Sequence, residues 1–393
     1  MNIKLLSGGG GGKRGYPGGG GGGGGATILN GITPPPSPAG IADGTVYIQY
    51  PDSWFLTALY EQMRKTKDGT TLIANLDFDD FDTDILLENG SWYAMANHGM
   101  QICLAGFIAA ANGLTNCIVT TLDGGITWQK TRDDGLFDYV NGLAWGNGVW
   151  VAVGSGANSM AYSIDGRHWV GLGVNNPLVE GFCVEWNGTQ FVAGGAPAVA
   201  TDPVLQYSSD GITWNNGDLA GSVTLTNASM LTWDGTKWYI NTSYMALDMA
   251  HSANGINWTQ YTPVGIGIKY PLSLKYGAPI AGTPVYVLVG RSAVGGVNSI
   301  AYSLDAVNWT NLGVALELRL DRVAWDGSLF MAVSSDQTIN SLVFSPDGVN
   351  WTGSGIILPY GGYHIGVTRT NNVSYPTGIY ICKAGVWVKT TMF

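Results

Sequence analysis

Charge is scarce in this sequence, and positive charge is scarcer than negative. Only 12% of the 393 residues are charged, and 18 Lys and Arg face 28 Asp and Glu, which gives a formal net charge of −10. A protein that binds nucleic acid needs a surface cluster of Lys and Arg that contacts the phosphates. Cations come close together only at Lys13-Arg14, at Arg64-Lys65-Lys67 and at Arg319 with Arg322. We therefore expect no nucleic-acid partner.

Long apolar stretches are also missing. No run of eighteen or more apolar residues occurs, so we expect no transmembrane helix and no membrane insertion. The first seven residues begin like a signal peptide, but glycine follows Ser7 and the apolar part is too short for that role. We expect a protein that stays in the compartment where it is made until something carries it out.

Cysteine and histidine are too few and too scattered for a disulfide framework or a metal site. The cysteines contain no C-x-x-C pair and are expected in the apolar core: Cys103, Cys117, Cys183 and Cys382. The histidines have no second ligand at metal-binding spacing: His98, His168, His251 and His364. The Asp-rich run 77–84 lacks the spacing of a calcium loop. We predict no metal and no cofactor.

One short phrase, by contrast, occurs six times. It reads Y-S-I-D-G-R-H-W at 162–169, and related copies end at the tryptophans Trp128, Trp214, Trp258, Trp309 and Trp351. Successive copies lie 41, 45, 44, 51 and 42 residues apart. A period of 40–50 residues that carries a strand–turn–strand phrase is typical of a β-propeller.

Each phrase follows two apolar runs joined by a turn. The clearest copy is 142–154, where Asn147-Gly148 separates the runs, and Asn-Gly and Asp-Gly pairs recur in the other repeats. Such pairs favour two-residue hairpin turns in which both residues have positive φ. We predict an all-β protein, a seven-bladed propeller of four-stranded blades, with six blades as the alternative. In the predicted ring, a leftover strand at 90–96 completes the C-terminal blade, which includes strands at 363–368, 378–382 and 386–390.

The N-terminal region has a different composition. Residues 8–25 contain fourteen glycines without a collagen period, and 33–40 is a Pro-rich extended spacer. The glycine tract is either a flexible linker or a segment gripped by, or bundled with, a partner chain. A strand is expected at 46–50. It is followed either by a short helix at 54–66 or by a hairpin that joins 57–66 to 70–76 through a turn at 67–69. We assign 1–83 to an extended anchor with a small β or mixed element, and 84–393 to the propeller.

The repeated phrases resemble the Asp-box, or BNR, repeat found in the propellers of sialidases, sortilin-type receptors and several glycosidases. The copy at 121–128 matches the full pattern, and the others are one residue shorter. The resemblance implies that the box lies between the third and fourth strands of a blade, that its carboxylate accepts backbone N–H bonds and that its tryptophan packs between blades. The residues expected to have this structural role are Asp123, Trp128, Asp165, Trp169, Asp210, Trp214, Asn254, Trp258, Asp305, Trp309, Asp347 and Trp351.

Catalytic patterns are not found. Sialidase chemistry needs an arginine triad, a Tyr–Glu pair and an acid, and the repeat region is poor in Arg and Glu. No nucleophile elbow and no P-loop occurs. Glu180 and Glu185 flank an inner strand, so a glycosidase would place its two carboxylates there. We nevertheless expect no enzyme and assign no catalytic residue.

The features together favour a structural virion protein of a tailed bacteriophage. Gly-rich segments and BNR-like propellers with this phrase are similar to those of phage tail-associated proteins. The resemblance implies a tail fibre or spike on the particle's exterior, with residues 1–83 docking on other virion proteins as a symmetric multimer. The propeller would then recognise a glycan or protein on the host surface. The alternatives are a propeller glycoside hydrolase or lectin acting on polysaccharide, and a capsid or tail decoration protein that binds no receptor.

Overall fold

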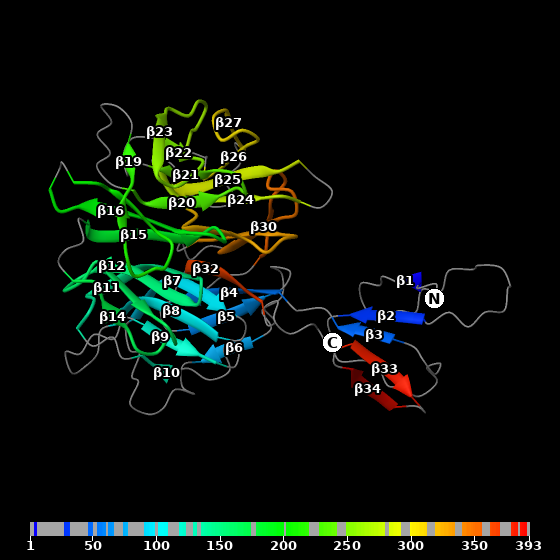
Figure 1. Ribbon diagram of the computed structural model, residues 1–393. Coiled ribbons are helices and arrows are strands. Elements are labelled where there is room, and N and C mark those ends of the chain that lie inside the picture. The colour runs from blue at the N-terminus through cyan, green and yellow to red at the C-terminus, as the bar shows by residue number, and fades with distance from the viewer. Residues whose placement is uncertain are drawn as a thin grey trace. The chain divides into compact units, whose positions relative to one another are not determined.

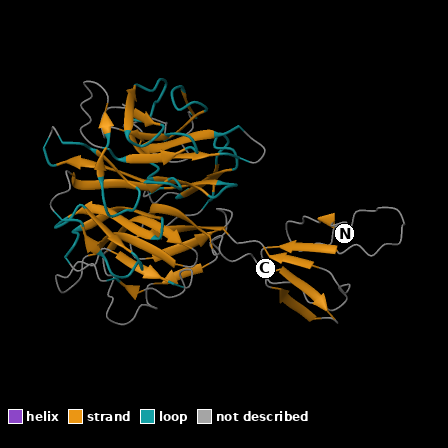
Figure 2. Cartoon of the chain, in the orientation of Figure 1, coloured by secondary structure: helices purple, strands orange, loops and turns teal. Residues whose placement is uncertain are grey.

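The computed structural model describes residues 90–355 with gaps, together with the backbone of a few strands outside that stretch. The gaps are 99–100, 109–117, 123–128, 132–134, 174–177, 200–201, 220–227, 242–248, 280–282, 292–298, 313–318 and 335–339. The glycine tract, the Pro-rich spacer and the Asp-rich run beyond Asp77 lie outside the described residues. All described regular elements are strands (Figure 2), and no helix of the described part is long and apolar enough to cross a membrane.

Six consecutive stretches of chain form six four-stranded antiparallel blades, which makes this an all-β propeller (Figure 1). Blades one to three contain β7 Gly90–His98, β8 Gln101–Ile108, β9 Ile118–Thr121, β10 Gln129–Lys130, β11 Tyr139–Gly146, β12 Val149–Ser155, β13 Met160–Ser163, β14 Val170–Gly171, β15 Leu178–Trp186, β16 Phe191–Pro197, β17 Leu205–Ser208 and β18 Asn215–Asn216. Blades four to six contain β20 Met230–Trp233, β21 Trp238–Asn241, β22 Met249–Ser252, β23 Asn257–Tyr261, β24 Tyr270–Gly277, β25 Val285–Arg291, β26 Ile300–Ser303, β27 Trp309–Asn311, β28 Arg322–Trp325, β29 Phe330–Val333, β30 Leu342–Ser345 and β31 Thr352–Gly353. The short strand β19, Asp218–Leu219, adds a parallel edge to blade four.

The turn between the first two strands of a blade takes two forms. At Asn147–Gly148 both residues have positive φ, 50° and 80°, as predicted for a two-residue turn. The turns that begin at Asn187, Asp234 and Asp326 are longer, and only their glycine has positive φ. There the Asn or Asp side chain accepts the N–H groups two and three residues later, at 2.6–2.9 Å. The prediction of two-residue turns was therefore wrong for these three copies, because the side chain replaces the second positive-φ residue.

The strand at 90–96 does not complete a C-terminal blade. It is β7, which pairs with β8 as the inner strand of the first blade. A further four-stranded sheet is built from both ends of the chain in the order β32-β4-β5-β6. Its strands are β32 Gly362–Arg369, β4 Ser53–Leu59, β5 Gln62–Thr66 and β6 Ala74–Asp77. β4, β5 and β6 thus pair as consecutive antiparallel strands, and the alternative of a short helix at 54–66 was wrong. The predicted hairpin strand 57–66 was wrong as well, because β4 and β5 divide that stretch and pair with each other.

The chain divides into two compact units, Trp54–Thr368 and the two terminal segments Met1–Ser53 and Arg369–Phe393. The terminal unit contains one sheet, with the strands β1 Lys4–Leu5, β2 Thr27–Gly31, β3 Val46–Gln49, β33 Ile379–Lys383 and β34 Val386–Thr390. These units differ from the predicted division at residue 83, which places β33 and β34 in the propeller and β4 to β6 in the anchor. The structure pairs β33 with β3 instead. The prediction failed here because the local sequence does not determine which distant segments pair.

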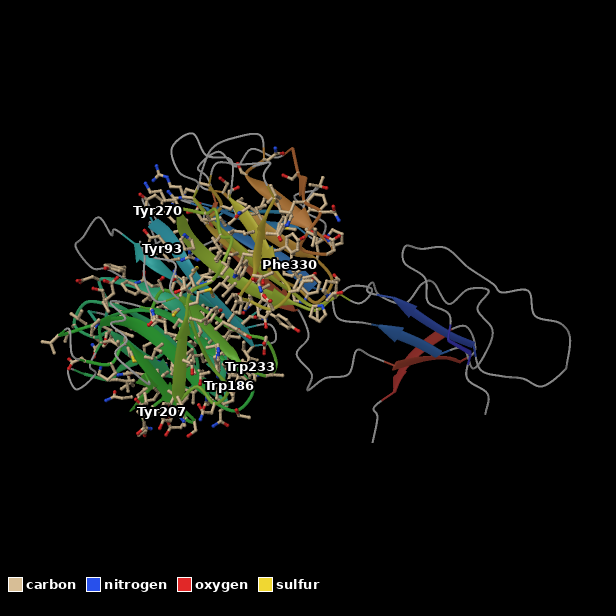
Figure 3. All side chains as sticks on the ribbon, turned by 90° about the horizontal axis from the view of Figure 1, so that it is seen from above. Tyr93, Trp186, Tyr207, Trp233, Tyr270 and Phe330 are labelled. Atoms are coloured by element: carbon tan, nitrogen blue, oxygen red, sulfur yellow. The ribbon has the colours of Figure 1, made fainter. Side chains whose placement is uncertain are left out.

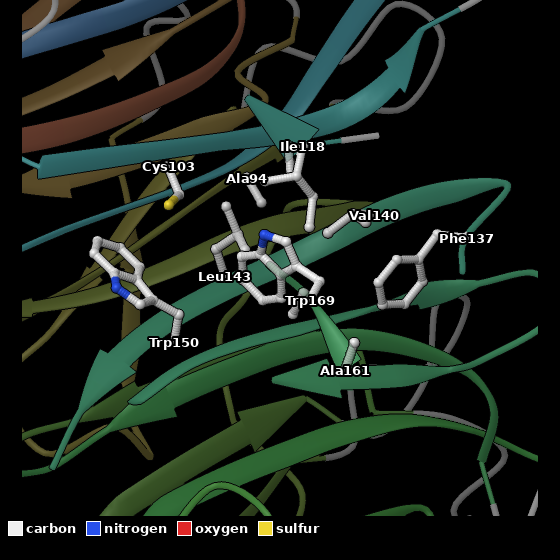
Figure 4. Packing of buried hydrophobic residues seen from close by; sticks show 11 residues of the cluster. Ala94, Cys103, Ile118, Phe137, Val140, Leu143, Trp150, Ala161 and Trp169 are labelled. Atoms are coloured by element: carbon white, nitrogen blue, oxygen red, sulfur yellow. The ribbon is translucent and has the colours of Figure 1, made fainter. Parts of the chain in front are cut away.

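Buried side chains fill the spaces between adjacent blades. In Figure 4, Trp169 of blade two packs against Ala94 and Ile118 of blade one. Trp258 of blade four is 1% exposed and belongs to a cluster with Val192 of blade three. Full burial of such large aromatic side chains supplies much of the free energy that joins one blade to the next.

Candidate functional site: the inner-strand cavity and its two ends

The blades have two distinct ends. At the hairpin face lie the turns between first and second strands and those between third and fourth strands, such as 147–148 and 164–169. At the loop face each chain segment enters a blade, at Tyr139, Leu178 and Tyr270 for blades two, three and five. This arrangement follows from the up-and-down order of the four antiparallel strands.

The inner strands of all six blades line a cavity of about 150 Å³. Each of five blades contributes three consecutive residues, and the sixth contributes Arg322 alone. Apolar walls come from side chains such as Leu143, Met230 and Leu274, whereas Asn141, Ser229 and Ser273 bring neutral polar groups. The lining therefore combines apolar side chains with polar groups that could orient a ligand, and most of the surface that it exposes is polar.

Arg322 is the one charged residue in the lining of this cavity. Its Nη1 donates to the carbonyl oxygens of Asp321, at 2.9 Å, and Leu272, at 3.2 Å. The second of these bonds joins blade six to the inner strand of blade five. A guanidinium has five N–H donors in a planar fork, so these two bonds fix its position while the cation stays next to the cavity.

An ion pair crosses the inner ring near the hairpin face. Lys275 Nζ on blade five lies 3.1 Å from Glu185 Oε1 on blade three, with both side chains partly exposed. Toward the loop face, Glu180 Oε1 accepts from the Tyr139 hydroxyl at 2.8 Å and from Asn141 Nδ2 at 3.2 Å. Burial, followed by the bond to Glu180, raises the pKa of Tyr139. The two glutamates therefore connect blade three to blades two and five.

Glu180 and Glu185 are too far apart to act as a glycosidase pair. They lie five residues apart on β15, which corresponds to about 16 Å along a strand. The two carboxyls of a retaining or inverting glycosidase lie within about 5–10 Å of each other. The backbone spacing therefore does not favour the pair that the hydrolase alternative would use.

The repeated phrase forms the same turn in five blades. In each, the Ser hydroxyl donates to the acidic or amide side chain, and that side chain accepts the N–H groups two and three residues later at 2.7–3.0 Å. Where a glycine follows, its N–H donates to the Ser hydroxyl. The residues at this position are Asp165, Asp210, Asn254, Asp305 and Asp347. The turn lies between the third and fourth strands, as the resemblance implied. Asp123 and Trp128 lie outside the described residues.

Hydrogen bonds within these turns hold the carboxylates in the charged form. The pKa of Asp305 is lowered to about 2, first by the side-chain amide of Asn308 and then by its backbone N–H. Burial opposes the shift at Asp347, but the N–H and amide of Asn350 outweigh it and lower the pKa. Four of the tryptophans, Trp214, Trp258, Trp309 and Trp351, donate Nε1 to the carbonyl three residues earlier, at 2.9–3.2 Å. The turn side chains are thus occupied by bonds within the fold.

A second set of aromatic residues lies at the hairpin face. The inner strands end in half-buried aromatic residues at equivalent places, namely Trp145, Trp186, Trp233, Tyr276 and Trp325. Trp186 packs so closely on Gly146 of the preceding blade that a Cβ there would lie 2.2 Å from its ring. Trp186 and Trp233 are labelled in Figure 3. The sequence shows these aromatic residues near the end of an apolar run, but it does not show the contact that they make with a neighbouring blade.

The scattered histidines and cysteines form no site in the described part of the chain. His98 stacks on Trp145 with 3.6 Å between ring centroids, and His168 Nδ1 lies 2.6 Å from Asp165 Oδ2. Burial raises the pKa of Cys103 and of Cys183 to about 12, which keeps both thiols protonated and unreactive. Cys183 also lines the cavity. Among the described residues no cluster of three or more His, Cys, Asp or Glu could hold a metal ion.

Comparisons with known proteins identify the fold and nothing narrower. The sequence matches no family model and no curated protein. The structure is similar to YCF48 bound to D1 peptide, with a TM-score of 0.50, 15% identity and coverage of 74% of this chain and 90% of that one. It is also similar to an inactive virginiamycin B lyase from Staphylococcus aureus with quinupristin, with a TM-score of 0.50, 12% identity and coverage of 69% and 86%. A chain of a nidogen–laminin complex matches with a TM-score of 0.46, 9% identity and coverage of 82% and 100%. Because 721 solved chains match, the fold does not select a function.

Proposed function

We propose that this chain is a non-catalytic recognition protein of a tailed bacteriophage particle, a tail fibre or spike whose propeller contacts a glycan or protein on the host surface. The observation that carries the proposal is the cavity between the inner strands, which exposes a mostly polar surface and is lined by apolar side chains, neutral polar groups and one arginine. The nearby glutamates, Glu180 and Glu185, are bonded to other blades, and their backbone positions are about 16 Å apart along an ideal strand. These features support binding rather than hydrolysis.

The place on a virion is supported by sequence. The phrase Y-S-x-D-G-x-x-W and the Gly-rich segment are similar to those of phage tail-associated proteins, and the low charge suits a rigid exterior domain. In this proposal residues 1–83 dock on other virion proteins, and the chain forms a symmetric multimer on the particle. Several propellers per particle would convert weak single contacts into tight attachment.

We further propose that the sheet β32-β4-β5-β6 is a seventh blade that closes the ring. It has four strands like the other six, and it joins a strand after blade six to strands before blade one. Pairing of the two chain ends in one blade would protect edges that otherwise attract further strands. We also propose that the repeated turn is an Asp box, because its Ser and Asp side chains make the same hydrogen bonds in each copy.

Two of the similar propellers are described with bound molecules, one with a peptide and the other with quinupristin. A propeller of this kind can therefore present a ligand site. For this chain we propose a host-surface molecule, because the sequence combines a display domain with an anchor-like N-terminal region.

The test is the binding of fluorescently labelled full-length chain to a panel of bacterial strains. The chain length of released and residual surface polysaccharide is measured in the same tubes by size-exclusion chromatography. Binding to particular strains without shortening of polysaccharide supports the proposal. Shortening would replace it by a hydrolase, and neither binding nor shortening would leave a decoration protein of the particle.

A further inference from the structure

Three residues distant in sequence form a row across neighbouring strands at the loop face of blade five. Tyr270, at the start of β24, is paired with Arg291 at the end of β25. Arg291 is in turn bridged to Arg319, and Leu320 N donates to Gly290 O at 3.0 Å. Residues directly opposite each other in antiparallel pairs present their side chains on the same face, about 5 Å apart. The row therefore places two guanidinium groups beside one aromatic ring.

Two further cations adjoin this row. Lys269 Nζ lies over the ring of Tyr270, 5.1 Å from its centroid. Arg322 bonds to Leu272 O, two residues after Tyr270, and so connects the row to the inner-strand cavity. We call Lys269, Tyr270, Arg291, Arg319 and Arg322 the basic row. Figure 3 labels Tyr270.

The described acid within this group is Asp321, which is only 3% exposed. Arg319 donates to its Oδ1 through Nε at 2.7 Å and Nη2 at 2.5 Å. Asp321 is thus enclosed and offsets one of the four cations, so the basic row has a positive balance on a chain with net charge −10. Lys269 and Arg291 are exposed and face solvent.

We propose that the basic row binds a carboxylate-bearing polysaccharide, a glycan with uronic acid or similar acidic sugars. The inference rests on the proposed recognition function and names its ligand class. Arg291 would bind a sugar carboxylate through its planar fork, and Lys269 would add a second positive charge. The partly exposed ring of Tyr270 offers an apolar surface for a sugar ring, and Asn141, Ser229 and Ser273 offer neutral polar groups inside the cavity.

A polysaccharide fits the row better than a peptide because cations, an aromatic surface and neutral polar groups follow one another from the rim into the cavity. A carboxylate fits better than a bulkier anion because the same row already holds one: Arg319 binds the Asp321 carboxylate through two nitrogen atoms. Attraction between exposed charges is screened by salt. Binding should therefore weaken as salt is raised.

The experiment measures binding of polygalacturonate by the full-length chain, with carboxyl-reduced polygalacturonate, dextran sulfate and a glutamate-rich peptide as parallel probes. Arg291→Ala and Lys269→Ala are the test variants, and both change exposed side chains. Lys237→Ala, an exposed cation on the hairpin face, is the matched control. We expect wild type and Lys237→Ala to bind polygalacturonate equally, and each test variant to bind about tenfold more weakly, the effect of one charge-assisted contact.

The outcomes separate this inference from the proposed function. Equal binding of the carboxyl-reduced polymer, or wild-type affinity in both test variants, would overturn the basic row as the site. Tighter binding of dextran sulfate or of the peptide would overturn the choice of a carboxylated polysaccharide. Attachment to bacterial cells without binding of any anionic polymer would overturn the inference and leave the recognition function standing. Failure of cell attachment would overturn the recognition function itself.

Discussion

The two faces of the propeller differ in how far their sequences repeat from blade to blade. At the hairpin face the same Ser-x-Asp-Gly turn recurs in blade after blade, and each turn satisfies its own hydrogen bonds. At the loop face the sequences differ from blade to blade, and the basic row occurs only once among the described blades. Residues that repeat in every blade thus have a structural role. A ligand site is expected where one blade differs from the others at equivalent positions.

The contrast predicts two separable kinds of variant. Changes at the hairpin face should alter the free energy of unfolding and leave ligand binding intact. Changes in exposed residues of the loop face should do the reverse.

The largest expected effect is loss of a box tryptophan. Trp258→Ala removes a side chain that is 1% exposed and packed between blades three and four, so we expect a loss of about 3–5 kcal/mol of stability. Chemical denaturation followed by circular dichroism measures the change. Ile164→Ala, at a residue 75% exposed in another box turn, is the control and should change stability by less than about 0.5 kcal/mol. Similar losses in both variants would contradict the packing role.

A smaller effect is expected at the glycine of the turn. Gly348 has a φ of +76°, and an added Cβ would lie 2.8 Å from Val285 Cγ1. Gly348→Ala should therefore cost about 1–3 kcal/mol. Blade five provides the comparison, because Ala306 already occupies the equivalent place at φ +64° and its methyl group is buried. Ala306→Gly relieves the strain of the positive φ but loses the packing of the methyl group, so we expect little change in the melting temperature. A large fall in the melting temperature would show that the two turns are not equivalent.

The turn carboxylates give a pH-dependent effect. The pKa of Asp305 is lowered to about 2 in the folded chain, so the charged form is favoured by folding. Its contribution to stability is present above the ordinary pKa near 4 and is lost as pH falls through about 2. Asp305→Asn should accordingly be less stable than wild type at pH 7, and the difference should shrink as pH falls from 4 to 2. Thermal denaturation across this range measures it, and a difference that grows on acidification would contradict the account.

The smallest expected change in stability is at the loop face. Arg291 is exposed, so Arg291→Ala should leave the free energy of unfolding within about 0.5 kcal/mol of wild type. Denaturation of this variant, run beside its polygalacturonate-binding assay, separates the two effects. A loss of stability as large as that of Gly348→Ala would mean that the arginine stabilises the fold and does not serve mainly to bind a ligand.

The range of each interaction determines how much of the structure sequence could predict. The Ser-x-Asp-Gly turn was predictable because its bonds reach only two or three residues along the chain, as at Asp347. The partners of the chain ends were not, because β3 pairs with β33 and β32 with β4 across most of the sequence. The basic row was missed for the same reason. Arg319 and Arg322 are close together in the sequence, but only strand pairing brings Tyr270 and Arg291 to them.

Hydrogen exchange of the full-length chain, with and without polygalacturonate, tests the division between the two faces most directly. We predict that the polymer protects backbone amides at 268–272, 290–291 and 319–322, while the turns at 163–169, 208–214 and 345–351 exchange at unchanged rates. Protection confined to those turns would contradict the account, because it would place the ligand on the face that we assign to structure.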